Sequence, residues 1–212
     1  MSDHLLADLD VIILDYGAGN LRSVVRAVER VGARPEVASV PAALDEADVL
    51  ILPGVGAAAD TMRNLRERAL VEPIREYIAN DRPFLGVCMG LQALMTVSEE
   101  GGEHACLDVL QGRVVRLPAG RKIPHMGWNR VELRRRTPLF DGIPDGSHFY
   151  FVHSYYCDMA EPDEVVAVAD YGTDVTAAVE RGRLAATQFH PEKSGAYGLR
   201  IYRNFLREHA CA

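Results

Sequence analysis

The sequence predicts an α/β fold, a three-layer open mixed sheet with a parallel core and an antiparallel extension. In the first half, short apolar runs alternate with helical patterns, and strands separated by helices imply right-handed crossovers and parallel pairing. In the second half, strand-like runs follow one another with only turn residues between them. Three turns that follow apolar runs contain glycine, and ligands of such sheets bind beyond the carboxyl ends of the strands.

In the first half, expected strands lie at residues 11–14, 35–38, 48–52 and 84–87. The run at 11–14 is continuously apolar, as in a strand buried on both faces. A helix is expected at 21–30, where apolar residues follow helical spacing, with Asn20 as its N-cap and Gly32 at its end. Further helical segments are expected within 57–80, and another helix at 91–95.

The second half contains six expected strands and a final helix at 196–209. The strands are residues 112–117, 128–133, 148–152, 164–168, 175–180 and 184–187. With 212 residues, the chain suits a single domain over 10–212, preceded by a loose extension at 1–9.

Composition excludes several classes of function. The net charge is −7 and no long basic run occurs, which argues against nucleic-acid binding. The four cysteines form no C-x-x-C pair, so we expect free thiols rather than disulfides or zinc, and no metal or cofactor. No apolar run approaches the ~20 residues that span a bilayer, and no signal peptide is evident, so we expect a cytoplasmic protein.

Cys88 is the most informative residue, because it lies between glycines in Gly86-Val87-Cys88-Met89-Gly90-Leu91-Gln92. A tight strand-to-helix turn needs small neighbours, and a helix N-terminus favours the thiolate and supplies N–H donors for an oxyanion. The pattern therefore predicts a nucleophile. The alternative is a buried structural cysteine, a common fate of free thiols. Cys106, Cys157 and Cys211 lack this context and are interpreted as structural.

A cysteine nucleophile needs a base, and the base needs a group that orients it. His190 follows the strand at 184–187, and Pro191 stiffens its turn. Glu192 is placed to hydrogen-bond the imidazole. Cys88, His190 and Glu192 thus form a candidate triad, although a histidine before a turn is more often a surface or capping residue when taken alone.

The two motifs together resemble the class I (triad) glutamine amidotransferase family. Within it, further stretches resemble the glutaminase subunits of imidazole glycerol phosphate synthase, from histidine biosynthesis. They are residues 15–24 (DYGAGNLRSV), 53–56 (PGVG), 124–129 (PHMGWN) and 150–155 (YFVHSY). The resemblance covers about residues 10–206 and departs at no triad position.

The resemblance implies that Cys88 attacks the side-chain amide of glutamine and that His190 handles the protons. The N–H groups of Val55 and Met89 would form the oxyanion hole. Gln92 lies one turn after Cys88 and would help to position the substrate, although it is equally a solvated helix residue. The other substrate-binding candidates are Gly54, Gly56, His153, Ser154 and Tyr155.

The loop at 53–56 is either an ordinary turn or a switch in which the Gly54–Val55 peptide flips to complete the oxyanion hole. The resemblance implies that such glutaminases stay nearly silent until the partner binds its acceptor. The implied partner is a (β/α)₈-barrel synthase in a heterodimer that receives the ammonia. Asn20, Tyr150 and Lys193 match partner-facing segments, and His125 and Trp128 are either core or interface.

Two alternatives remain. The first alternative is a glutaminase of another synthase, such as the one for pyridoxal phosphate, against which the stretches at 15–24 and 124–129 argue. A catalytically dead regulatory module on the same fold is the second alternative, against which the intact triad argues. Glutamate release from glutamine distinguishes the second alternative from the main hypothesis.

Overall fold

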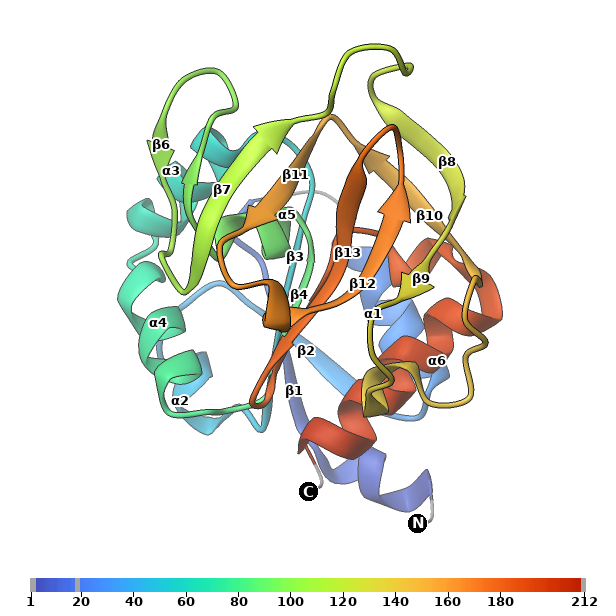
Figure 1. Cartoon of the computed structure of the whole chain (residues 1–212). Helices are drawn as coiled ribbons and strands as arrows, with labels where there is room; N and C mark the ends of the chain where they lie inside the picture. Colours follow the sequence, from blue (N-terminus) through green and yellow to red (C-terminus); the bar gives the residue numbers. More distant parts are fainter. Residues whose placement is uncertain (1–2, 18–19, 211–212) are drawn as a thin grey trace.

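The structure, a computed structural model, describes residues 3–17 and 20–210 and has the expected three layers (Figure 1). Its central sheet has the strand order β2-β1-β3-β4-β14-β13-β12-β9. The first five strands of this order are parallel, and the last three join antiparallel. The bounds are β1 Asp10–Leu14, β2 Arg34–Ala38, β3 Val49–Gly54, β4 Phe84–Cys88, β9 Glu132–Leu133, β12 Val165–Asp170, β13 Asp174–Arg181 and β14 Leu184–Thr187.

Helices cover both faces of this sheet. On one face, α1 (Leu21–Arg30) and α6 (Gly195–Phe205) pack against Ile13. On the other face, Ile12 and Leu14 pack with residues of α2 (Ala43–Glu46), α3 (Ala58–Glu67), α4 (Val71–Ala79) and α5 (Met89–Ala93). A fully buried aliphatic side chain contributes roughly 1.5–3 kcal/mol. Burial on both faces therefore explains the continuous apolar run of β1.

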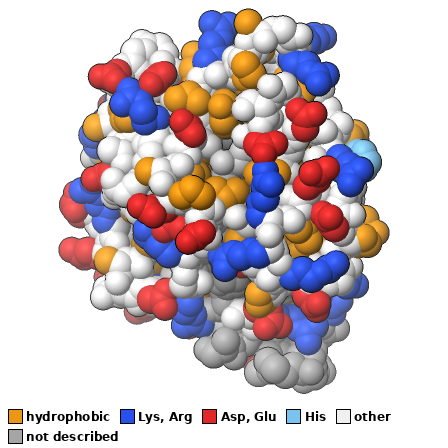
Figure 2. All heavy atoms as spheres, in the orientation of Figure 1, with side chains coloured by type: hydrophobic (Ala, Val, Ile, Leu, Met, Phe, Trp, Pro, Cys, Tyr) orange, Lys and Arg blue, Asp and Glu red, His pale blue; other side chains and the backbone are white. Residues whose placement is uncertain are grey.

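Two smaller sheets lie in the upper part of Figure 1, away from the two termini. One is four-stranded, in the order β11-β7-β5-β6, and the other pairs β10 with β8 antiparallel. Their bounds are β5 Met95–Ser98, β6 His104–Ala105, β7 Leu110–Arg116, β8 His125–Arg130, β10 His148–His153 and β11 Tyr155–Met159. On the surface in Figure 2, acidic and basic side chains are interspersed.

Several sequence expectations need correction. The helical segment at 57–80 is two helices, and Ala69 between them has a φ of 53°. The helix expected at 91–95 is the short α5, and Met95 begins β5 instead. The strand expected at 128–133 is divided between β8 and β9, which belong to different sheets. The sequence analysis also missed α2, β5, β6 and β11.

The described part of the N-terminal segment is more ordered than expected, and the final helix lies close to its expected position. Residues Asp3–Asp8 form a 3-10 helix, and Leu6 is buried in the core, so this part of the chain is packed rather than loose. The final helix begins at Gly195, and Leu206–Ala210 continues it as a π-helical turn. Further 3-10 turns lie at Pro138–Phe140, Pro162–Glu164 and Pro191–Lys193. Across residues 3–17 and 20–210, we find no helix with the length and apolar character needed to cross a membrane.

Candidate active site

Cys88 stands at the carboxyl end of β4, where the chain turns sharply into α5. Its φ of 54° lies in the region that side chains other than glycine rarely adopt. A Cβ on Gly90 would lie 1.9 Å from the carbonyl oxygen of Leu52 in β3, so only glycine allows α5 to pack this closely. The small residues around Cys88 are therefore required by the geometry of the turn.

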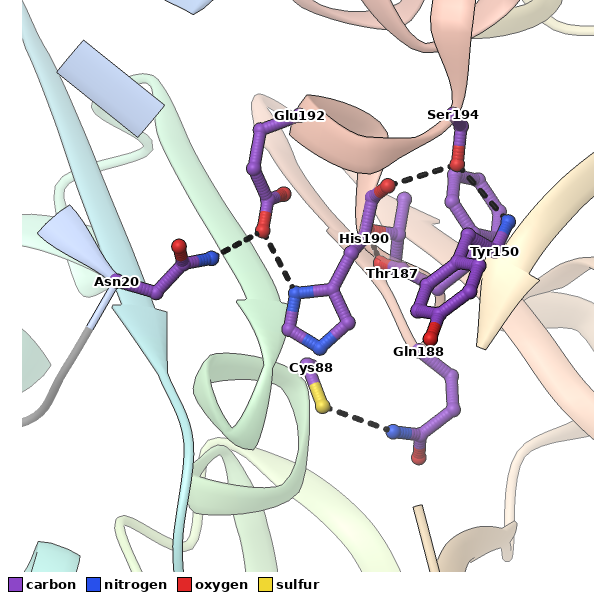
Figure 3. Close-up of polar contacts among 9 residues, drawn as sticks. Asn20, Cys88, Tyr150, Thr187, Gln188, His190, Glu192 and Ser194 are labelled. Carbon is purple, nitrogen blue, oxygen red and sulfur yellow. Dashed lines mark hydrogen bonds and ion pairs between the residues drawn. The ribbon is translucent and has the colours of Figure 1, made fainter. Parts of the chain in front are cut away.

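His190 comes within reach of Cys88 because β14 pairs in parallel with β4. The Nδ1 of His190 donates to Oε1 of Glu192 over 2.8 Å, and Nδ2 of Asn20 donates to the same oxygen over 2.6 Å. In Figure 3, the Nε2 edge of the His190 ring faces Cys88. The structure thus brings Cys88, His190 and Glu192 together in the expected order.

Asn20 does not cap α1 as expected. It has a φ of 75° and makes no side-chain capping bond, because its amide is bound to Glu192 instead. A carboxylate is a stronger acceptor partner for this amide than water or a helix end offers. Asn20 therefore helps to orient the triad carboxylate, and its role toward a partner stays a prediction.

The electrostatics favour a protonated His190. Burial lowers the pKa of the imidazole, but the hydrogen bonds and charges of Cys88 and Glu192 outweigh burial and raise the pKa to about 10. Tyr202 of α6 also interacts with Glu192. Burial raises the pKa of its phenol well above the usual value, and the Glu192 carboxylate raises it further. Tyr202 lies within the helix expected at 196–209, and no sequence pattern indicated this contact.

A cavity of about 250 Å³ opens in front of Cys88. Most of the predicted oxyanion and substrate residues line it with the thiol: Val55, Gly56, Met89, Gln92, His153, Ser154 and Tyr155. Gly54 does not line it; this residue pairs with Cys88 across β3 and β4. A larger hollow of about 450 Å³, lined in part by Arg135, Glu180 and Arg183, has neither a cysteine nor a histidine among its lining residues.

Glu100 also lines the cavity, and the sequence analysis missed it. The backbone N–H of Ala58, at the start of α3, donates to its Oε2 over 2.9 Å. Glu100 is the one carboxylate among the residues that line this cavity. In the sequence it follows Glu99 near a pair of glycines, and nothing local distinguishes one glutamate from the other.

Two buried histidines support the far wall of the cavity. The Nδ1 of His153 donates to the carbonyl of Tyr155 over 2.8 Å, so its Nε2 accepts a hydrogen bond from Nδ1 of His125 over 2.9 Å. Burial lowers the pKa of both rings to about 4, so both are neutral. His125 is therefore a core residue, whereas Trp128 is 57% exposed.

The other thiols differ from Cys88. Cys106 and Cys157 are buried, and burial raises the pKa of Cys106 to about 11 and that of Cys157 well above its usual value. Cys211 lies outside the described residues. Within residues 3–17 and 20–210, no group of three or more histidine, cysteine or acidic side chains is placed to hold a metal ion.

A cysteine on a strand-to-helix turn, with a histidine and a glutamate beside it, has the arrangement of a triad hydrolase site. The model of the family "Glutamine amidotransferase class-I" matches residues 12–209, and the chain belongs to this family.

Two relatives of higher sequence identity carry the name of a particular synthase subunit. The chain is 50% identical over 197 residues to a protein of Dehalococcoides mccartyi named imidazole glycerol phosphate synthase subunit HisH, which covers 93% of this chain and 96% of the relative. A protein of the same name from Chloroflexus aurantiacus is 50% identical over 202 residues, covering 93% and 95%. A crystal structure of a glutamine amidotransferase from Thermotoga maritima has a TM-score of 0.67 at 18% identity, covers 96% and 99%, and supports the fold alone.

Proposed function

We propose that this chain is the glutaminase subunit of an imidazole glycerol phosphate synthase. It hydrolyses glutamine to glutamate and ammonia, and the ammonia passes to a synthase subunit in histidine biosynthesis. The observation that carries the proposal is the placement of Cys88 beside His190 and Glu192 at the mouth of a cavity of about 250 Å³. The names of the two relatives at 50% identity support the choice of synthase.

The proposed reaction begins with attack of the Cys88 thiolate on the side-chain amide carbon of glutamine. The oxyanion that forms is bound by the N–H groups of Met89 and Val55. His190, which is held in its protonated form, gives its proton to the departing ammonia and then accepts one from the water that hydrolyses the thioester. Glu192 and Asn20 keep the imidazole in the required tautomer and orientation.

Glutamine also carries an α-ammonium and an α-carboxylate, and the cavity offers complementary groups. The Glu100 carboxylate is fixed by the N–H of Ala58 and is placed to pair with the α-ammonium. The backbone of Ser154 and Tyr155, across the cavity, is placed to bind the α-carboxylate. Neutral His153 and His125 hold this backbone in position without adding charge.

Replacing Glu100 by glutamine tests this substrate geometry. The Glu100→Gln side chain keeps an acceptor for Ala58 N–H but loses the charge that pairs with ammonium, so KM for glutamine rises about tenfold or more while kcat changes less. Steady-state glutamate release measures both constants. Glu99→Gln is the matched control, because Glu99 pairs with Arg113 over 2.8 Å and is half exposed outside the cavity. Equal KM values for the two variants would exclude Glu100 from substrate binding.

The proposed partner is a (β/α)₈-barrel synthase subunit, bound as a heterodimer in the cytoplasm. Trp128 is 57% exposed, and its ring packs edge-on against Tyr150 at 6.2 Å between centroids. The Lys193 ammonium lies 5.9 Å from the centre of the Tyr150 ring. Exposed aromatic side chains of this kind are enriched at protein interfaces.

This surface is directly connected to the triad. The His190 N–H donates to the Tyr150 carbonyl over 2.9 Å, and the Tyr150 N–H donates to the Ser194 hydroxyl over 3.0 Å. The Ser194 hydroxyl in turn donates to the His190 carbonyl over 2.7 Å (Figure 3). A partner seated on Tyr150 therefore contacts the residue whose backbone fixes His190. A flip of the Gly54–Val55 peptide remains our proposed second route of activation.

Glutamate release measured with and without the synthase subunit and its acceptor ribonucleotide tests the whole proposal. We expect slow release by the isolated chain and an increase of at least about 10²-fold with both additions, as expected when one oxyanion donor is completed. No release under any condition would mean a catalytically dead module. Activation by a pyridoxal phosphate synthase instead would assign the chain to that enzyme.

A further inference from the structure

A buried amide that the proposed mechanism does not use lies against the nucleophile. Gln188 is 0% exposed, and its Nε2 donates to Sγ of Cys88 over 3.5 Å, within the range of hydrogen bonds to sulfur (Figure 3). Its Oε1 accepts from Nε2 of Gln92 over 3.0 Å. The same Nε2 of Gln92 donates to the carbonyl of Tyr155 over 2.8 Å. Three residues thus form a continuous chain from the cavity wall to the thiol.

The Tyr155 carbonyl determines which group donates and which accepts in each of these hydrogen bonds. A backbone carbonyl only accepts, so Gln92 must present its NH₂ group to Tyr155. The second hydrogen of that NH₂ group then points to Gln188, which must present its oxygen. The NH₂ group of Gln188 is consequently left facing Cys88. A buried amide turned the other way would place oxygen against oxygen and lose its hydrogen bonds, at a cost that folded proteins avoid.

We propose that Gln188 is a further catalytic residue, whose amide N–H stabilises the Cys88 thiolate. The proposal rests on the proposed role of Cys88 as the nucleophile. A hydrogen bond to an anion is stronger than one to a neutral group, so the contact is strongest when sulfur is charged. Sulfur carries that charge before attack on glutamine and again when the thioester is hydrolysed and thiolate leaves. In the thioester itself the sulfur is neutral and the contact weakens.

Two features of the site make the Gln188 amide important for stabilising the Cys88 thiolate. The helix α5 has five residues, so few aligned peptide dipoles face the thiol. The charged partner of the thiolate is His190, which gives up its proton to the departing ammonia during the reaction. Gln188 remains a donor throughout, because an amide does not titrate in this range. It therefore holds the sulfur while the charge on His190 changes.

The test combines two variants of Gln188 with a readout of the thiolate. Gln188→Met removes the donor at similar volume, and Gln188→Glu keeps an acceptor for Gln92 but replaces the donor with a carboxylate. Alkylation of Cys88 by iodoacetamide is followed against pH by mass spectrometry of the peptide that contains Cys88. A cooperative thermal unfolding transition, followed by circular dichroism, reports whether each variant is folded.

For Gln188→Met we expect the midpoint of the alkylation profile to move up by about one pH unit and kcat/KM for glutamine at pH 7 to fall about tenfold. Gln188→Glu should move the midpoint further. Thr187→Val is the matched control, because Thr187 is equally buried at the end of β14, directly before Gln188, and its hydroxyl donates to the Phe189 carbonyl over 3.0 Å. It should leave the alkylation profile unchanged.

An unchanged alkylation profile in a folded Gln188→Met variant would overturn the proposal, even if glutaminase activity fell. If Gln188→Met shows no cooperative unfolding transition, the profile of Gln188→Glu decides in the same way. A shifted profile in a protein that releases no glutamate would keep the Gln188 contact and refute the glutaminase function. The two ideas therefore fail separately.

Discussion

Cys88→Ala is expected to abolish glutamine-dependent synthesis by the complex and to leave ammonia-dependent synthesis intact. Removing the nucleophile of a triad lowers turnover by about 10⁴-fold or more, because the remaining groups only bind and polarise the substrate. Ammonia supplied from solution bypasses the glutaminase site. The change deletes one sulfur atom and keeps the backbone at its φ of 54°, so the turn itself is retained. Product formation with each nitrogen source measures both outcomes.

Cys106→Ala is the control for this experiment. Cys106 is also a buried free thiol, but it lies outside the residues that line the cavity. This variant should retain both activities. If Cys88→Ala lost ammonia-dependent synthesis as well, Cys88 would be structural and the proposed mechanism would be wrong.

The parallel half of the fold is the part that local patterns predict well. The runs at β1, β3 and β4 are apolar on both faces, since their alternate residues enter different cores, as Ile12 and Ile13 do. Prediction from local patterns fails where an apolar run is too short to distinguish helical spacing from strand spacing. Leu94 and Met95 extend the helical pattern of α5, yet Met95 begins a strand that pairs with Leu110 of β7.

The prediction of one continuous strand at 128–133 was wrong for a different reason. Its alternation is correct locally, but the N–H of Val131 bonds the carbonyl of Ser147 in the chain that leads into β10, and β9 then pairs with β12. Which sheet a strand joins depends on partners distant in the sequence. Local alternation contains no information about them.

The residues of the candidate site likewise include some that local patterns predicted and others that they did not. Cys88 was predicted because it lies in a glycine-flanked turn, and His190 and Glu192 because a base and a carboxylate stand two residues apart after a strand. Glu100 and Gln188 were missed because their positions depend on α3 and on Gln92. Asn20 was assigned the local role of a cap, and a carboxylate 172 residues away displaced that role. The contacts of Glu100, Gln188 and Asn20 thus depend on tertiary structure, which local sequence patterns do not contain.

Gly54→Ala is the second variant with a large expected effect, because no space exists for its methyl group. A Cβ at this position would lie 2.1 Å from the hydroxyl oxygen of Tyr16 and 2.8 Å from Cβ of Met89. Tyr16 is 1% exposed, and Met89 follows the nucleophile, so neither side chain has room to withdraw. The loop must shift, and the Val55 N–H shifts with it. We expect glutamine-dependent activity to fall at least about 10²-fold, the cost of losing one oxyanion donor, with ammonia-dependent synthesis retained.

Adding Tyr16→Phe to Gly54→Ala removes the closer of the two contacts and leaves the one with Met89. Partial recovery of glutamate release is therefore expected in the double variant, with Tyr16→Phe alone as its reference. Thermal unfolding of Tyr16→Phe alone separates relief of this contact from a general change in stability, because removal of a buried hydroxyl changes stability by itself. Full glutaminase activity in Gly54→Ala would show that the loop tolerates displacement, and the Gly54–Val55 peptide would then not supply the oxyanion donor.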